Sequence, residues 1–259
     1  MRLLMIGDIV GKPGRRAVKQ NLPGLVSQLA VDMVIANGEN AAGGNGITKD
    51  VAQELFASGV DVITMGNHVW NKKEIYTYIN HEARIIRPAN YPPGAPGRGF
   101  GVFRSKNGSE LGVINISGRI FMQELDCPFR KADELVNQLK EKVNIIFVDF
   151  HAEASSEKMA MGWYLDERVA AVCGTHTHVQ TADERILPGG TAYISDVGMT
   201  GPKDSVIGVK KELVIEKFIT QMPRRFEVAE GLYQFNAVII DVDEALGRAV
   251  GIERIQNFE

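Results

Sequence analysis

The chain has 259 residues, of which 44% are hydrophobic and 24% charged, and its formal net charge at pH 7 is −3. This composition is typical of a globular protein, and it has no excess of basic residues that would favour binding to duplex nucleic acid. No apolar stretch approaches the roughly 20 residues that span a bilayer, and the first apolar run meets Asp8 too early for a signal peptide. The two cysteines, Cys127 and Cys173, show no metal or redox spacing. We expect a cytoplasmic protein without a membrane partner.

The first 80 residues alternate apolar strands with helices, which predicts a parallel sheet covered by helices. Strands are predicted at residues 3–7, 33–37 and 62–65, and a glycine-rich loop at residues 41–46. Helices are predicted at residues 15–29, 48–58 and 71–80. Pro23 is expected to kink or break the first helix, Thr48 to cap the second, and Asn71 with Glu74 to form a capping box for the third.

The rest of the chain adds a hairpin, further buried strands and two helices. Residues 87–98 are rich in proline and glycine and predict a loop. The hairpin is expected to turn at residues 106–108, between strands 99–105 and 110–117. The remaining predictions are helices 130–140 and 210–221, buried strands 143–150, 169–173 and 191–195, a loop at 196–207, and antiparallel strands 226–241 and 249–255. No linker or repeat interrupts this order, so a single domain, residues 1–259, is expected.

Five apolar runs end in side chains that commonly bind metals. In chain order these are Asp8, Glu39 with Asn40, Asn67 with His68, His151, and His176 with His178. Because ligands bind at the carboxyl ends of strands in open α/β sheets, we expect these groups to meet at one sheet edge. His176 and His178 are two residues apart, and such residues point to the same side of an extended segment.

Except for the late histidine pair, each of these residues has a structural explanation when it is taken alone, such as a turn before a capped helix for Asn67 with His68. Asp8 could be a strand-end or capping carboxylate, Glu39 with Asn40 a polar loop, and His151 a core histidine with satisfied hydrogen bonds. Only the His176 and His178 pair indicates a function unaided. The joint arrangement favours a metal centre, because the alternative requires five coincidences at one edge.

The candidate donors are nitrogen and oxygen atoms without a thiolate, which favours Mn, Fe, Zn or similar ions. The seven candidate ligands are more than one tetrahedral ion needs; they are Asp8, Glu39, Asn40, Asn67, His151, His176 and His178. Two ions that share a bridging carboxylate would use them. Two ions roughly 3.5–4 Å apart clamp the attacking and leaving oxygens of a phosphoryl displacement.

Four motifs carry a resemblance to the calcineurin-like metallophosphoesterase superfamily, and more closely to its YmdB-type subgroup. They are Gly7-Asp8-Ile9-Val10-Gly11, Asn37-Gly38-Glu39-Asn40-Ala41, Gly66-Asn67-His68 and Gly174-Thr175-His176-Thr177-His178. The subgroup is similar along nearly the whole chain, including residues 196–201. The resemblance implies an α/β fold, a four-layer αββα sandwich of two mixed β-sheets. It also implies a dinuclear centre usually containing iron, self-association into a homo-oligomer, and 2′,3′-cyclic nucleotide phosphodiesterase activity.

The chain departs from the broad superfamily at two positions. The usual Asp-x-His motif is Asp8-Ile9-Val10 here, without the histidine, and Glu39 replaces the usual bridging aspartate. Both departures are shared by the YmdB-type subgroup. They leave the identity and occupancy of the first metal open.

The resemblance also implies roles for individual residues. One ion would be bound by Asp8, Glu39, Asn40 and His178, and the other by Glu39, Asn67, His151 and His176. The expected cofactor is two metal ions, with iron favoured and Mn or Zn as alternatives. A hydroxide bridging the ions would attack phosphorus. His68, with a reference pKa of ~6.5, is the general-acid candidate. No substrate-binding residue is identified.

Three other functions share parts of this pattern. A phosphomonoesterase or protein phosphatase could use the same metals, although the missing histidine and the lack of a large cap insertion argue against it. An amidohydrolase usually has its His-x-His pair on the first strand, whereas here the pair comes late. A metal-dependent regulator that binds nucleotides without catalysis stays open.

Overall fold

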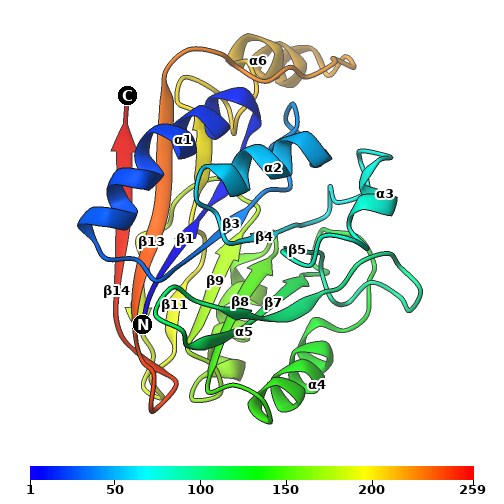
Figure 1. Cartoon of the computed structure of the whole chain (residues 1–259). Helices are drawn as coiled ribbons and strands as arrows, with labels where there is room; N and C mark the ends of the chain where they lie inside the picture. The colour runs from blue at the N-terminus through cyan, green and yellow to red at the C-terminus, as the bar shows by residue number, and fades with distance from the viewer.

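The computed structural model describes residues 1–259, and two β-sheets form its centre (Figure 1). The strands of the first sheet are β1 (Arg2–Ile6), β2 (Asp8–Ile9), β3 (Met33–Asn37), β4 (Val62–Thr64), β5 (Ile85–Ile86), β12 (Met199–Pro202), β13 (Tyr233–Asp243) and β14 (Arg248–Phe258). Those of the second are β6 (Phe100–Arg104), β7 (Glu110–Ser117), β8 (Ile145–His151), β9 (Ala171–Thr175), β10 (Arg185–Ile186) and β11 (Ala192–Ile194).

Both sheets are mixed. The first has the order β2-β12-β13-β1-β3-β4-β5, with β14 paired to β13. In it β1, β3, β4 and β5 are parallel, whereas β13 runs antiparallel to β1. The second has the order β10-β11-β9-β8-β7-β6, with parallel central strands and antiparallel edge strands. The carboxyl ends of the parallel strands therefore gather at one edge of each sheet.

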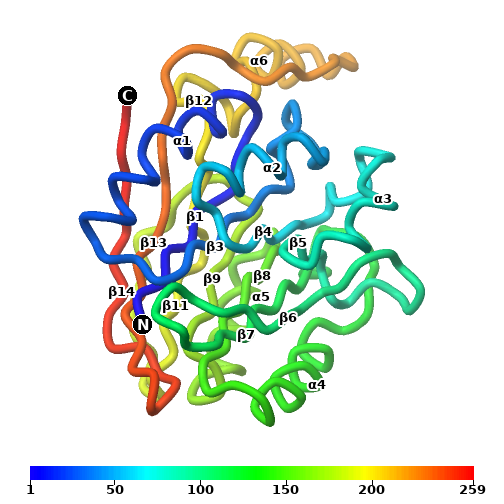
Figure 2. The backbone as a smooth tube through the Cα atoms, viewed as in Figure 1, coloured from blue at the N-terminus to red at the C-terminus, as the bar shows by residue number.

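Six helices flank the two sheets. They are α1 (Gly11–Gln28), α2 (Lys49–Ala57), α3 (Ile75–Tyr78), α4 (Pro128–Lys140), α5 (Ser155–Leu165) and α6 (Lys211–Thr220). Figures 1 and 2 show α1 and α2 beside the first sheet and α4 and α5 beside the second. No helix combines the length and apolar character needed to cross a bilayer.

Three clusters of buried apolar side chains fill the spaces between these layers. Leu4 and Ile6 of β1 pack with α1 and α2, whereas their neighbours Leu3 and Met5 pack between the two sheets. The third cluster joins the outer face of the second sheet to α4 and α5. Central strands are thus buried on both faces, which is why their sequences are continuously apolar. The order helix, sheet, sheet, helix confirms the four-layer αββα sandwich.

Several local predictions are confirmed. The Thr48 side chain caps α2 by accepting a hydrogen bond from the Val51 N–H at 3.3 Å. Strands β6 and β7 form the predicted hairpin.

Helix α1 differs from its prediction at two points. It begins at Gly11, four residues before the predicted start, because Pro13 is tolerated in a first helical turn. The helix also continues through Pro23 instead of breaking there.

Other local predictions are wrong. The helix expected at 71–80 is only the short α3, and no side chain caps it. The Glu74 carboxylate instead accepts a hydrogen bond from the Lys49 N–H at 2.7 Å. The loop expected at 196–207 contains β12, the helix α5 was not predicted, and β13 begins at Tyr233 instead of 226.

Candidate metal centre

The strand ends bring the predicted residues together, but from two sheets instead of one. Asp8 lies in β2, while Glu39 and Asn67 follow β3 and β4 of the first sheet. His151 ends β8 of the second sheet, and the two late histidines follow β9. The expectation of a single sheet edge is therefore wrong. The site lies where the carboxyl edges of both sheets meet.

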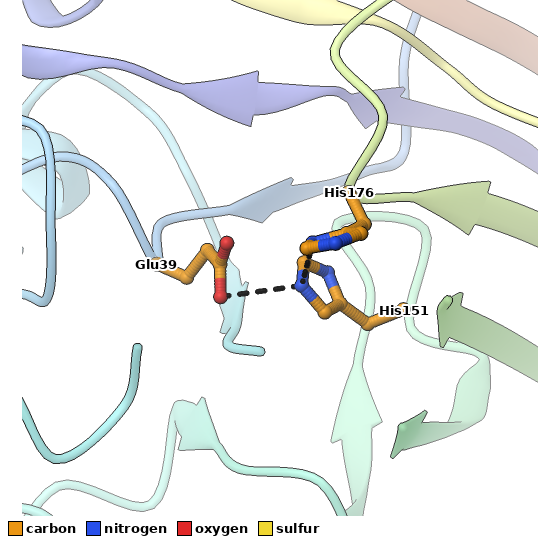
Figure 3. A group of neighbouring side chains, drawn as sticks. All are labelled: Glu39, His151 and His176. Atoms are coloured by element: carbon orange, nitrogen blue, oxygen red, sulfur yellow. Dashed lines mark hydrogen bonds and ion pairs between the residues drawn. The ribbon is translucent and has the colours of Figure 1, made fainter. Parts of the chain in front are cut away.

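The first group of converging side chains contains Glu39, His151 and His176 (Figure 3). One ligand-type atom from each lies within 4.8 Å of the others. His151 Nε2 is 3.3 Å from Glu39 Oε2 and 3.1 Å from His176 Nδ1. The Asn67 Oδ1 atom is 2.9 Å from His151 Nε2. Three side chains, those of Glu39, Asn67 and His176, thus lie within contact distance of His151 Nε2.

The second group contains Asp8, Glu39 and His178. His178 Nε2 lies 3.9 Å from Asp8 Oδ1. The Asn40 side-chain amide is 3.2 Å from His178 Nε2 and donates to Glu39 Oε1 at 3.0 Å. Glu39 belongs to both groups, the position that a bridging carboxylate would need.

Two observations show that these residues fit cations. The Asp8 Oδ1 atom is buried without a hydrogen-bond partner, although Oδ2 accepts from the His176 N–H at 3.0 Å. An unpartnered buried carboxylate oxygen is costly unless something else binds it. Glycine at position 66 also keeps space open, because a Cβ there would lie 2.2 Å from Glu39 Oε2 and 2.3 Å from His151 Nε2. Carboxylate, amide and imidazole donors suit Mn, Fe or Zn.

Burial and the neighbouring charges shift the pKa values of the carboxylates and imidazoles in these groups. Burial raises the pKa of Asp8 to about 6, against the opposing effect of His178. Burial also works against ionised Glu39, but the facing His151 and His68 hold its pKa below the usual range. For His151 burial favours the neutral ring, yet Glu39 and Asp8 raise its pKa to about 9. Burial and the His151 charge lower the pKa of His176 to about 3. The buried Asp8 and Glu39 carboxylates therefore favour positive charge beside them, as a cation would supply.

The ring nitrogen of His151 that points away from the donor groups, Nδ1, begins a buried hydrogen-bond chain through Thr175 to Asp149, which we call the relay. His151 Nδ1 lies 2.9 Å from Thr175 Oγ1, which donates to Asp149 Oδ1 at 2.8 Å. Because the hydroxyl has one proton and gives it to Asp149, its oxygen accepts from the His151 Nδ1–H. This arrangement leaves Nε2 of His151 to face the first group. Such outer hydrogen bonds fix the tautomer of metal-binding histidines.

The other two histidines are oriented in the same way. His178 Nδ1 lies 2.9 Å from the Ile207 carbonyl oxygen, and His176 Nε2 lies 3.2 Å from Glu153 Oε2. His176 and His178 have φ values of 103° and 68°, and β9 has already ended at Thr175. The expectation that an extended segment aims both rings to one side is therefore wrong. A left-handed turn directs each ring to a different group.

His68 lies beside both groups on the solvent side. Its side chain is 37% exposed, and its Nδ1 lies 2.7 Å from Asn40 Oδ1. Its backbone N–H donates to Glu39 Oε2 at 3.2 Å. His68 is adjacent to the converging donors but belongs to neither group.

Three residues around the donors were not predicted from the sequence: Asp149, Thr175 and Glu153. Asp149 is fully buried and accepts hydrogen bonds from Thr64, Thr175 and Asn37. Burial raises its pKa, while these donors favour the charged form. A carboxylate inside the apolar run of β8 was a signal for such a role, because charged residues are almost never fully buried without partners.

The chain matches the family model described as YmdB-like protein over residues 4–255. It is 54% identical over 255 residues to a 2′,3′-cyclic-nucleotide 2′-phosphodiesterase from Bacillus subtilis (strain 168), covering 98% of this chain and 96% of the relative. It resembles a hypothetical protein from Thermus thermophilus, with 44% identity, a TM-score of 0.94 and full coverage of both chains. It also resembles a structure described as a novel phosphatase from Mycoplasma pneumoniae, with 36% identity, a TM-score of 0.94, and coverage of 100% and 93%.

Proposed function

Since the chain belongs to the family of YmdB-like proteins, we propose that it is a metal-dependent phosphodiesterase acting on small phosphodiesters, above all 2′,3′-cyclic nucleotides. The observation that carries the proposal is the convergence of two donor groups that share Glu39. The Bacillus subtilis relative, which bears the name of this activity, matches almost the entire chain. A small cyclic nucleotide is therefore the proposed substrate, and duplex nucleic acid is not.

The proposed ligand sets follow the two groups. Asp8, Glu39, Asn40 and His178 would hold one cation, and Glu39, Asn67, His151 and His176 the other. Iron is the proposed metal, and Mn or Zn would suit the same donors. Bound ions would neutralise charge on the phosphoryl oxygens and make a water molecule more acidic.

His68 is the proposed general acid. Its Nδ1 lies within hydrogen-bonding distance of Asn40 Oδ1, which orients the ring. With Nδ1 donating to that oxygen, Nε2 is the nitrogen left to protonate the leaving ribose oxygen. The bond from phosphorus to that oxygen breaks as a water oxygen bonds to phosphorus and releases a proton to solvent. The side chain is only partly buried, so solvent and a bound substrate have access to it.

The assembly of the site supports one functional unit. Asp8 and Glu39 come from the first sheet, and His151 and His176 from the second. We therefore propose that residues 1–259 act as a single domain, since neither sheet alone carries a complete donor group. A homo-oligomeric state is also proposed, because the resemblance to the YmdB-type subgroup implies self-association.

The test combines metal content with substrate choice. Protein purified without chelator is measured by elemental analysis and assayed on 2′,3′-cyclic AMP, 3′,5′-cyclic AMP and p-nitrophenyl phosphate. We expect bound transition metal and a clear preference for the 2′,3′-cyclic substrate. Glu39→Gln should lose metal and turnover together, because both groups share this carboxylate.

A second candidate function is phosphomonoester hydrolysis, which the name phosphatase for the Mycoplasma pneumoniae structure favours. Preferential turnover of p-nitrophenyl phosphate would assign that function instead. Tight nucleotide binding without turnover under Mn²⁺ or Fe²⁺ would assign a regulatory role. Full activity of Glu39→Gln would remove the bridging role of this residue.

A further inference from the structure

A buried ion pair lies behind the turn that carries the two late histidines. Lys158 of α5 donates to Asp196 Oδ2 at 2.6 Å, and the two side chains are only 2% and 1% exposed. The stem of Lys158 packs against Gly174, where an added Cβ would lie 3.2 Å from Lys158 Cδ. Burying two charges is costly and often adds no net stability. A gain in net stability therefore does not by itself explain the pair.

The Asp196 carboxylate also binds the residue between the two histidines. Its Oδ2 accepts from the Thr177 N–H at 3.0 Å and from the Thr177 hydroxyl at 2.7 Å. Its Oδ1 accepts from the Gly198 N–H at 2.8 Å. One carboxylate thus connects α5, the histidine turn and the segment before β12. We call the contacts among Asp196, Lys158 and Thr177 the threonine clamp.

The turn needs such support because its backbone is unusual. His176 and His178 both have φ in the left-handed region, which residues with a Cβ rarely adopt. Conformations of this kind persist only where the surroundings hold them. Backbone hydrogen bonds secure the ends of the turn, from Val197 N–H to the Gly174 carbonyl at 2.9 Å and from Met199 N–H to the His178 carbonyl at 3.1 Å. The middle of the turn is held by Asp196.

We propose that Asp196 is a positioning residue that, paired with Lys158, holds Thr177 so that His176 and His178 each face their own donor group. This inference rests on the proposed function, because it assumes that the two imidazoles bind cations. Asp196 belongs to neither donor group and acts through Thr177. Releasing the clamp would let the turn relax, and each group would lose the placement of one imidazole.

The main test removes a single hydroxyl. Thr177→Val keeps the branched shape and the backbone N–H bond to Asp196 but loses the hydroxyl bond, whereas the matched control Thr177→Ser keeps both donors. The dissociation constant of the full-length protein for Mn²⁺ is measured by competition with a chromophoric chelator. We expect Thr177→Val to bind Mn²⁺ about tenfold more weakly, the lower end of the range for such supporting residues. Thr177→Ser should stay within about twofold of wild type because its hydroxyl still donates.

A second variant tests the ion pair itself. Asp196→Asn alone would leave the buried Lys158 charge unpaired, so it is combined with Lys158→Met, which removes both charges. We expect Mn²⁺ affinity to fall in this double variant as well. Thermal unfolding of the metal-free proteins, followed by circular dichroism, measures the fold separately from the metal.

The outcomes distinguish the clamp from a merely structural role. Wild-type Mn²⁺ affinity in Thr177→Val would overturn the proposal. Equal weakening by Thr177→Val and Thr177→Ser, with a matching loss of the metal-free fold, would also overturn it. Turnover of the wild type tests the proposed function separately. A wild type that binds Mn²⁺ but hydrolyses no phosphoester contradicts the phosphodiesterase proposal, while the clamp is still decided by Mn²⁺ affinity alone.

Discussion

Adding one methyl group at position 66 should disable the candidate metal centre. A Cβ at Gly66 would lie 2.2 Å from Glu39 Oε2, 2.3 Å from His151 Nε2 and 2.5 Å from His151 Cδ2. The φ of Gly66 lies outside the left-handed region, so alanine suits the backbone and only the side-chain contacts are disturbed. Gly66→Ala therefore probes the space between the two donor atoms.

The size of the disturbance follows from these distances. Cβ atoms essentially never approach a neighbour within 3.0 Å, so Glu39 Oε2, at 2.2 Å, must retreat by at least 0.8 Å. Metal–ligand distances tolerate only about 0.2 Å, and a misplacement of about 1 Å can cost roughly 10²-fold in rate. We expect Gly66→Ala to lower kcat/KM for 2′,3′-cyclic AMP by about 10²-fold or more. Overpacking should also cost about 1–3 kcal/mol of folding stability.

The assay pairs metal content with thermal unfolding, and the chain offers a matched control. Gly24 lies inside α1 and an added Cβ meets nothing within 4 Å. Gly24→Ala should leave metal content and turnover unchanged and raise stability by about 0.5–1 kcal/mol, because glycine is unfavourable inside a helix. Wild-type metal content and turnover in Gly66→Ala would refute the assignment of Glu39 and His151 to one cation.

Three further predictions concern the residues around the donor groups. His68→Ala should lower turnover by about 10²–10⁴-fold, the usual contribution of a general acid, with nearly unchanged metal content by elemental analysis; loss of metal would make His68 a ligand. Thr175→Val should weaken Mn²⁺ binding by about 10–100-fold, because His151 Nδ1 loses its acceptor, while Thr175→Ser should not; equal affinities of the two variants would rule out the relay. The pKa of His151 near 9 means that its ring is charged at pH 7 and must lose a proton to bind metal, so Mn²⁺ affinity should rise between pH 7 and 9. Calorimetry in buffers of different ionisation enthalpy should show proton release at pH 7, and no release would contradict the prediction.

Local features that depend on neighbouring residues could be predicted from the amino-acid sequence. Strands β1, β3 and β8 were predicted from continuous apolar runs. Such runs occur because the central strands of a covered sheet are buried on both faces. The Thr48 cap and the β6–β7 hairpin also follow from a few adjacent residues. The residues at the strand ends were identified in the same way, since each directly follows its apolar run.

Long-range packing, in contrast, selects the distant partners that these segments meet. Strand β12 was missed because its pairing depends on Gln234 and Asp8, far away in the chain. Glu74 was expected to cap its own helix but meets Lys49 instead. The convergence of two sheet edges on Glu39, and the clamp between Asp196 and Thr177, likewise depend on the folded arrangement. Periodicity and spacing report on a residue's neighbours in the chain, whereas donor groups form only when segments far apart in sequence are packed together.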